Sequence, residues 1–189
     1  MDKSTMDASS AFGRQPGDLS SREQLERVIR VDHAGEFGAV RIYEGQLSVL
    51  KDTGDADTVR HMKEQEEVHR KKFEELLAER RVRPTLLGPI WHVAGFALGA
   101  GTAMLGKEAA MACTEAVEEV IDTHYQKQLD ELDENEAELK KTIAQFRDEE
   151  IEHRDIAREK GASEAPGYEL LTTAVKTGSK LAIWLSSRI

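Results

Sequence analysis

Apolar residues recur at helical spacing along most of this chain, and no stretch alternates apolar and polar residues for long. The chain is rich in Ala, Leu, Glu, Lys and Arg, which favour helices. The pattern therefore predicts an all-α protein. A first helix should begin at Ser20 or Ser21, where Ser21 and Gln24 match a weak capping box, and should end before Asp52. Further helices are predicted over about 55–83, in a stretch that ends near 132, and over 136–160 and 166–187.

The segment from Pro84 to Gly106 contains no Asp, Glu, Lys or Arg. By length it could span a bilayer, which needs about 20 apolar residues. Pro89, His92 and several glycines argue against a span, and no second strong apolar segment returns the chain. We expect instead a helix that lies in the membrane interface, with Trp91 and Phe96 immersed. A buried core helix or a protein interface is the alternative.

The predicted C-terminal helix could assist this membrane contact. Its apolar residues fall on one helical face, which comprises Leu170, Leu171, Ala174, Val175, Leu181, Ala182 and Leu185. Trp184 lies on or beside that face, and three cationic side chains could reach lipid headgroups: Lys176, Lys180 and Arg188.

Length and charge restrict the class of protein. With 189 residues and 39% hydrophobic content, the chain can form one compact core, so we expect a single domain over 21–189. The net charge is −10 and no basic block could neutralise a run of phosphates, so we expect no nucleic-acid partner. Cys113 is the only cysteine, which excludes an intramolecular disulfide framework. Residues 1–20 lack the apolar core of a secretory signal and should form a flexible leader.

A pattern of acidic residues and histidines occurs twice. Glu36 precedes a Glu-x-x-His motif at 66–69 by 30 residues, and Glu118 precedes a second such motif at 150–153 by 32. Glu and His three positions apart share one helical face, so each motif can direct a carboxylate and an imidazole inward. Four carboxylates and two imidazoles suit two ions such as iron or manganese. The predicted metal ligands are Glu36, Glu66, His69, Glu118, Glu150 and His153.

One such motif would carry little weight, because acidic residues on helices are usually solvated. Two motifs with matching upstream glutamates and apolar neighbours favour a two-metal site held by four helices. Adjacent acids leave the register open at Glu67, Glu119 and Glu149. Spacing to the histidines selects Glu66 and Glu150, whereas Glu118 over Glu119 rests on the repeat alone.

Other residues near the pattern have two interpretations. Tyr43 and Tyr125 each follow a predicted ligand by seven residues. They could donate hydrogen bonds to the ligands, act as redox-active phenols, or simply pack in the core. Asp32 and Asp148 could orient the ligand imidazoles or could be solvated surface residues.

Four segments also resemble a known family, the ubiquinone-biosynthesis hydroxylases that act on demethoxyubiquinone, within the ferritin-like di-iron carboxylate superfamily. They are RVIRVDHAGEFGAVRIYEGQ at 27–46, KEQEEVHRKKF at 63–73, FALGAGTAMLGKEAAMACTEAVEE at 96–119 and FRDEEIEHRDIA at 146–157. The resemblance implies a ferritin-like antiparallel four-helix bundle with an extra apolar helical segment and a C-terminal fifth helix. Its ligand positions fall on the same six residues.

The resemblance further implies hydroxylation of the quinone ring of a polyprenylated demethoxyubiquinone by two Fe ions, O2 and reducing equivalents from NADH. It implies peripheral attachment to the mitochondrial inner membrane on the matrix side, or to the cytoplasmic membrane of a bacterium. A lipid-presenting partner protein within a ubiquinone-biosynthesis complex is also implied. Separately, self-association through the apolar segment is a hypothesis.

Three other functions compete with this interpretation. A rubrerythrin-type peroxidase is close in chemistry, but the cysteine pairs of its usual electron-transfer domain cannot be made from one cysteine. An iron-binding ferritin-like protein would use the same ligands, but it has no need of the uncharged segment 84–106. A non-catalytic, membrane-associated helical adaptor would explain that segment, but it would leave the duplicated carboxylates without a purpose.

Overall fold

The computed structural model describes residues 19–189, and within them it contains helices and no strand. The prediction of an all-α chain is thus confirmed. All but two residues of the predicted flexible leader, 1–20, lie outside the described part of the chain. The helices are α1 (Ser21–Leu50), α2 (Ala56–Arg80), α3 (Gly88–Met104), α4 (Lys107–Glu131), α5 (Ala137–Glu159) and α6 (Tyr168–Ser186), with short 3-10 turns η2 (Glu134–Glu136) and η3 (Ala162–Glu164).

Two helix ends differ from the prediction. The capping box at the start of α1 is formed one residue earlier than expected, by Ser20 and Glu23. The Ser20 hydroxyl accepts from the Glu23 amide at 3.1 Å, and the Ser20 amide donates to the Glu23 carboxylate at 2.7 Å. Helix α2 ends at Arg80 rather than near 83, because Arg81 adopts a left-handed conformation with φ of 54° that closes the last turn.

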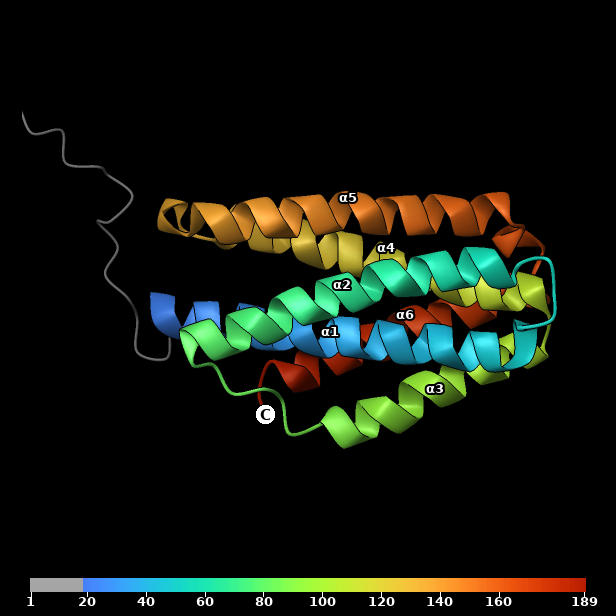
Figure 1. Cartoon of the computed structure of the whole chain (residues 1–189), viewed down its shortest axis with the longest axis horizontal. Helices are drawn as coiled ribbons and strands as arrows, with labels where there is room; N and C mark the ends of the chain where they lie inside the picture. Colours follow the sequence, from blue (N-terminus) through green and yellow to red (C-terminus); the bar gives the residue numbers. More distant parts are fainter. Residues whose placement is uncertain (1–18) are drawn as a thin grey trace, which may run out of the picture.

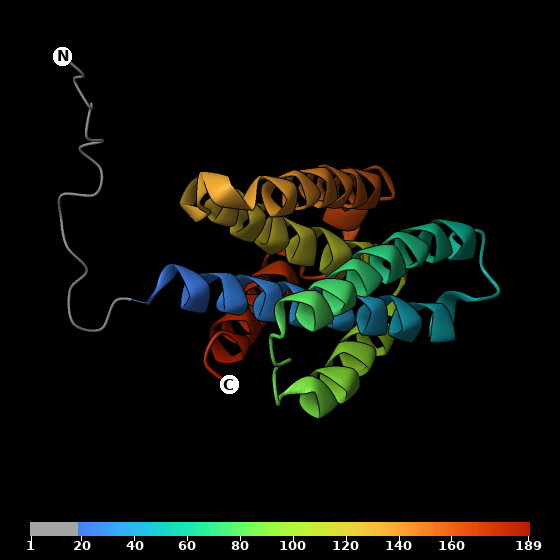
Figure 2. The ribbon, with the colours of Figure 1, turned by 60° about the vertical axis from the view of Figure 1, so that its left-hand side comes forward.

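The helices form two hairpins with two further helices packed outside them (Figure 1). Helices α1 and α2 form one hairpin, and α4 and α5 form the other. Helix α3 packs along α1, and α6 packs along α4 and touches the side of α1. In the turned view of Figure 2, α3 and α6 lie on the side of α1 away from α5. The space enclosed by α1, α2, α4 and α5 is therefore the interior of the molecule.

Glycines bring α3 unusually close to α1. A Cβ atom on Gly99 would collide with the carbonyl oxygen of Ile42, and one on Gly95 would lie 2.9 Å from the carbonyl oxygen of Gly38. On the α1 side, a Cβ on Gly45 would collide with the backbone of Phe96. The glycines of the uncharged segment therefore allow direct backbone packing of two helices.

The outer face of α3 remains apolar and exposed. Ile90 is 55% exposed and Val93 is 66% exposed, and Met104 and Leu105 continue the same surface. Helix α3 is thus not the buried core helix considered as an alternative. Within residues 19–189, no helix is long and apolar enough to cross a membrane.

The apolar face expected on the C-terminal helix divides into two strips. Val175 is buried and Leu171 packs against the core, but Leu170 and Leu181 point outward together with Trp184. The face is wider than its contact with α4, so only one strip of it is covered.

Candidate metal centre and apolar groove

The six residues of the duplicated pattern meet in the interior of the bundle, and all six are buried. Glu36 comes from α1, Glu118 from α4, and each Glu-x-x-His pair from α2 or α5. The donor atoms form two overlapping groups in which all atoms lie within 4.8 Å of one another. Glu66 and Glu150 belong to both groups, the first of which is completed by Glu36 and His69, and the second by Glu118 and His153.

Both imidazoles turn the Nδ1 atom toward this cluster. Nδ1 of His153 lies 3.1 Å from Oε1 of Glu66 and 3.2 Å from Oε2 of Glu150. Nδ1 of His69 lies 3.2 Å from Oε1 of Glu150 and 3.6 Å from Oε2 of Glu36. One helical turn thus places the Glu and His of each motif side by side, as their spacing predicts.

The outer nitrogen of each imidazole is held by a residue that sequence reasoning did not single out for this role. Nε2 of His69 lies 2.6 Å from Oε2 of Glu149, and Nε2 of His153 lies 2.9 Å from Oε1 of Gln65. Each partner immediately precedes the Glu of the other motif, so the repeat could have revealed the pair.

The aspartates expected in that role lie elsewhere. Asp32 is buried beside His124 and Gln128, and Asp148 is exposed. The interpretation that they orient the ligand imidazoles was wrong, because Glu149 and Gln65 occupy the outer ring nitrogens. The alternative, a solvated surface residue, holds for Asp148.

Two buried tyrosines cross between the halves of the repeat. The Tyr43 hydroxyl donates to Oε1 of Glu118 at 2.8 Å, and the Tyr125 hydroxyl donates to Oε1 of Glu36. Burial, followed by the nearby carboxylates, raises the pKa of both phenols well above 10. Both side chains therefore remain protonated donors at neutral pH and fix one oxygen of a candidate ligand.

The cluster holds more negative charge than its hydrogen bonds can compensate. Burial first, and then repulsion by Glu150, raises the pKa of Glu66 and Glu118 well above 4.5. Both carboxylate oxygens of Glu66 lack a hydrogen-bond partner among the described residues. Buried carboxylates without partners are costly unless a cation neutralises them. The donor set therefore fits two divalent ions with carboxylate and imidazole ligands.

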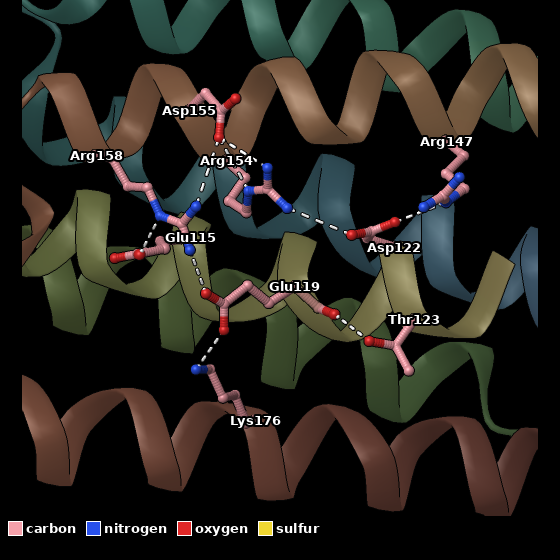
Figure 3. A network of polar contacts seen from close by, with 9 residues as sticks. All are labelled: Glu115, Glu119, Asp122, Thr123, Arg147, Arg154, Asp155, Arg158 and Lys176. Carbon is pink, nitrogen blue, oxygen red and sulfur yellow. Dashed lines mark hydrogen bonds and ion pairs between the residues drawn. The ribbon is translucent and has the colours of Figure 1, made fainter. Parts of the chain in front are cut away.

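Glu118 and Glu119, the neighbours between which the sequence left the ligand open, point in different directions. Glu118 points into the cluster, whereas Glu119 contacts Arg158 of α5 and Lys176 of α6 on the outside (Figure 3). Nearby, Glu115 accepts hydrogen bonds from Arg158 at 2.6 Å and from Tyr168 at 2.8 Å. These outer contacts join α6 to the α4–α5 hairpin.

A groove of about 420 Å³ runs between α1, α3 and α6, and its lining is almost entirely apolar. A smaller cavity of about 10 Å³ adjoins it and is bordered by Glu36, Glu66, Glu118 and Glu150. The two spaces share five wall residues, Val31, Gly35, Ala39, Ile121 and Ile183. The groove therefore lies next to the carboxylate cluster, with these five residues between them. Sequence reasoning missed these wall residues, because they come from three helices and form no local motif.

Comparison with known proteins gives consistent matches along the chain. Residues 23–186 match the family model described as ubiquinone biosynthesis protein COQ7. The chain is 58% identical over 180 residues to a 3-demethoxyubiquinol 3-hydroxylase of Rhodospirillum rubrum, covering 95% of this chain and 85% of that protein. It is 49% identical to the human NADPH-dependent 3-demethoxyubiquinone 3-hydroxylase, mitochondrial, with coverage of 95% and 89%. The match to the yeast 5-demethoxyubiquinone hydroxylase, mitochondrial, is 44% identical, with coverage of 87% and 78%.

Proposed function

This chain belongs to the family of ubiquinone biosynthesis protein COQ7, and we propose that it hydroxylates the quinone ring of a demethoxyubiquinone at a di-iron centre. The observation that carries the proposal is the apolar groove that shares wall residues with a small cavity bordered by four glutamates of the six-residue cluster. The groove suits an apolar substrate, and the cluster suits ions that react with dioxygen.

In this proposal the bundle is a ferritin-like di-iron domain. Glu36 and His69 would hold one iron, Glu118 and His153 would hold the other, and Glu66 and Glu150 could contribute to either, since they belong to both groups of donor atoms. When bound, the two ions supply the dioxygen and electron-transfer chemistry of the reaction.

The chain's own residues prepare the site around the metals. Tyr43 donates a hydrogen bond to one carboxylate oxygen of Glu118 on α4, and Tyr125 donates one to Glu36 on α1. Glu149 and Gln65 hold the outer nitrogens of the imidazoles and thereby fix the orientation of both rings. The apolar walls of the groove disfavour water in the space that the substrate would occupy.

The groove gives the substrate a direction of approach. The quinone head would lie at its inner end near Gly35 and Ala39, and the polyprenyl tail would run outward between α3 and α6. The expected electron source was NADH, whereas the animal and slime-mould relatives are named NADPH-dependent. A reduced nicotinamide is therefore the reductant we propose, and comparing the two cofactors in the assay decides between them.

The exposed apolar surfaces support peripheral membrane attachment. The outer face of α3 and the exposed strip of α6 flank the groove, so immersion of both would open it toward the lipid. The guanidinium of Arg188 lies 3.9 Å from the centre of the Trp184 ring, at the end of this surface. The membrane would be the mitochondrial inner membrane on its matrix side, or the cytoplasmic membrane in a bacterium.

The function is tested by metal and product analysis of wild type and Glu150→Ala. We expect two irons per wild-type chain after anaerobic reconstitution, and hydroxylated product from a short-tail demethoxyquinone. Because Glu150 belongs to both metal groups, its removal should abolish both iron binding and product. A wild-type protein that binds no iron after reconstitution would refute the proposal and favour the adaptor function.

Membrane attachment has its own test, the double variant Ile90→Asp/Val93→Asp. We expect it to lose co-sedimentation with anionic phospholipid vesicles, since two charges would enter the immersed face. Val68→Asp is the matched control, because Val68 is an apolar residue of α2 that is 62% exposed and lies outside this face. Equal vesicle binding by the wild type and the double variant would contradict the membrane proposal. The lipid-presenting partner and self-association are tested by light scattering, with and without detergent and with the partner protein added.

A further inference from the structure

The internal repeat extends to a pair of glutamines that occupy equivalent places in the two halves. Gln46 lies three residues after Tyr43, and Gln128 lies three residues after Tyr125. Each glutamine contacts the residue four positions before a candidate ligand of the other half, which is Glu118 for Gln46 and Glu36 for Gln128. Nε2 of Gln46 donates to the Thr114 hydroxyl at 3.2 Å, and Nε2 of Gln128 donates to Oδ1 of Asp32 at 2.7 Å.

The two equivalent places differ in their chemistry. The first half of this arrangement is neutral, because the partner is Thr114 and the position equivalent to His124 is Ile42. In the second half Asp32 is buried, and Nε2 of His124 lies 3.4 Å from its Oδ1. A threonine therefore fills the structural role that Asp32 fills, so packing alone does not require an ionisable pair here.

The ionisable pair connects the surface with the metal centre. The His124 side chain is 20% exposed, whereas Asp32 is buried and its Oδ2 has no hydrogen-bond partner within residues 19–189. Asp32 and His124 both border the small cavity that also contains Glu36 and Tyr125. Its volume of about 10 Å³ is close to that of one water molecule by the same measure. A water there could bridge the unpaired oxygen of Asp32 to the cluster.

The hydroxylation consumes protons that must reach this enclosed site. A ring C–H bond is replaced by a C–OH bond, and the second oxygen atom of O2 leaves as water. The balance requires two electrons from the reduced nicotinamide and two protons. The groove that admits the substrate is lined by apolar side chains and offers almost no groups for proton transfer.

We propose that His124 and Asp32 form the proton-entry path of the hydroxylase, with His124 taking protons from solvent and Asp32 passing them to the cavity beside Glu36. This inference rests on the proposed function. Burial raises the pKa of Asp32, and contacts with His124 and Gln128 oppose that shift.

The repeat supplies the test variants. Asp32→Thr and His124→Ile install the residues that the other half already uses at these places, and Asp32→Asn keeps the shape of the side chain without its ability to relay a proton. Thr114→Val is the control, because it removes the glutamine contact of the neutral half. Circular dichroism and the absorption of bound Co2+ establish, without turnover, that each variant folds and binds two metals.

With wild-type hydroxylation as the reference, we expect His124→Ile and Asp32→Asn to lower turnover on the order of 100-fold. The H2O2 released per nicotinamide oxidised should rise, because reduced oxygen that receives no protons through this path would leave the site and take its two protons from solvent. Added imidazole should restore turnover in His124→Ala but not in Asp32→Asn, which a purely structural role would not explain. Thr114→Val should keep wild-type turnover and coupling.

The possible outcomes separate this inference from the function itself. An inactive wild-type protein refutes the proposed function. An active wild type, together with metal-loaded His124→Ile and Asp32→Asn variants that hydroxylate at the wild-type rate, refutes only the proton path. If the Asp32→Thr variant does not bind Co2+, the turnover of the isosteric Asp32→Asn variant decides whether the proton path exists.

Discussion

The Tyr43 hydroxyl donates a hydrogen bond of 2.8 Å to Glu118, a residue that lies 75 positions away in the other half of the repeat. Tyr125 makes the equivalent bond to Glu36. Each half therefore supplies the hydrogen bond that orients the single glutamate of the other. These hydrogen bonds link the two halves through the metal centre, in addition to their apolar packing. They are buried, and the low dielectric of the interior strengthens them.

Removing one of these bonds should weaken metal binding. We expect Tyr43→Phe to lower Co2+ affinity about 10- to 100-fold, because Glu118 would lose the donor that fixes its oxygen. Competitive titration with a chelating dye measures the affinity. Tyr168→Phe is a matched control, since Tyr168 also donates to a glutamate at 2.8 Å, but to Glu115 outside the centre. Equal losses in both variants would mean that the effect is general destabilisation.

The neighbours Glu118 and Glu119 should respond oppositely to the same change. Glu118→Gln should reduce the bound metal below two ions per chain, because a neutral amide is a poor ligand. Glu119→Gln should leave two ions bound, since this side chain pairs with Arg158 and Lys176 on the outside. Metal analysis after gel filtration distinguishes them. Loss of metal in the Glu119 variant would contradict this prediction and would identify Glu119 as the ligand.

The metal-free protein should become less stable as the pH rises. The pKa of Glu66 and Glu118 is raised by burial and by neighbouring carboxylates, so the folded state holds protons that the unfolded chain releases above about 4.5. The free energy of unfolding must then fall as pH increases from that value through the folded-state pKa. Thermal melts of metal-free protein at pH 5 and pH 8 should show the lower Tm at pH 8. Glu118→Gln should reduce this difference, and a Tm that rises with pH would contradict the assignment.

Two glycines of α3 should tolerate alanine very differently. Gly99→Ala should lower the free energy of unfolding by about 2 kcal/mol or more, because its Cβ would collide with the backbone of α1. Gly101 has nothing within 4 Å of an added Cβ, so Gly101→Ala should stabilise the helix by up to about 1 kcal/mol. Urea unfolding monitored by circular dichroism measures both. Similar values for the two variants would show that α3 does not pack closely on α1.

Filling the groove should weaken substrate binding without affecting metal binding. Gly38 lines the groove, and a Cβ there would enter open space. Gly38→Leu should therefore raise KM for the quinone about 10- to 100-fold, the effect of a misfit of about 1 to 3 kcal/mol in an apolar pocket, and leave metal content unchanged. Gly101→Leu adds the same side chain outside the groove and should keep the wild-type KM. An unchanged KM in Gly38→Leu would place the quinone elsewhere.

The sequence by itself determined the helices and the six candidate ligands. Helical spacing is a local property, so the positions of Glu66 and His69 on one face follow from their separation of three residues. The repeat added information over longer distances, because two halves that fold alike must direct equivalent residues to the same interior. For that reason Glu36 and Glu118 could be identified although neither is followed by a histidine three residues later.

Only the tertiary structure decided what surrounds those ligands. The contacts of Glu149 and Gln65 with the imidazoles, the path of the groove between α1, α3 and α6, and the pairing of Asp32 with His124 depend on the rotation and separation of helices distant in sequence. A helix pattern fixes which residues share a face, but not how far that face is turned toward its neighbour. The close approach of Gly95 to the backbone of Gly38 is likewise a property of two helices together, and both glycines line the groove.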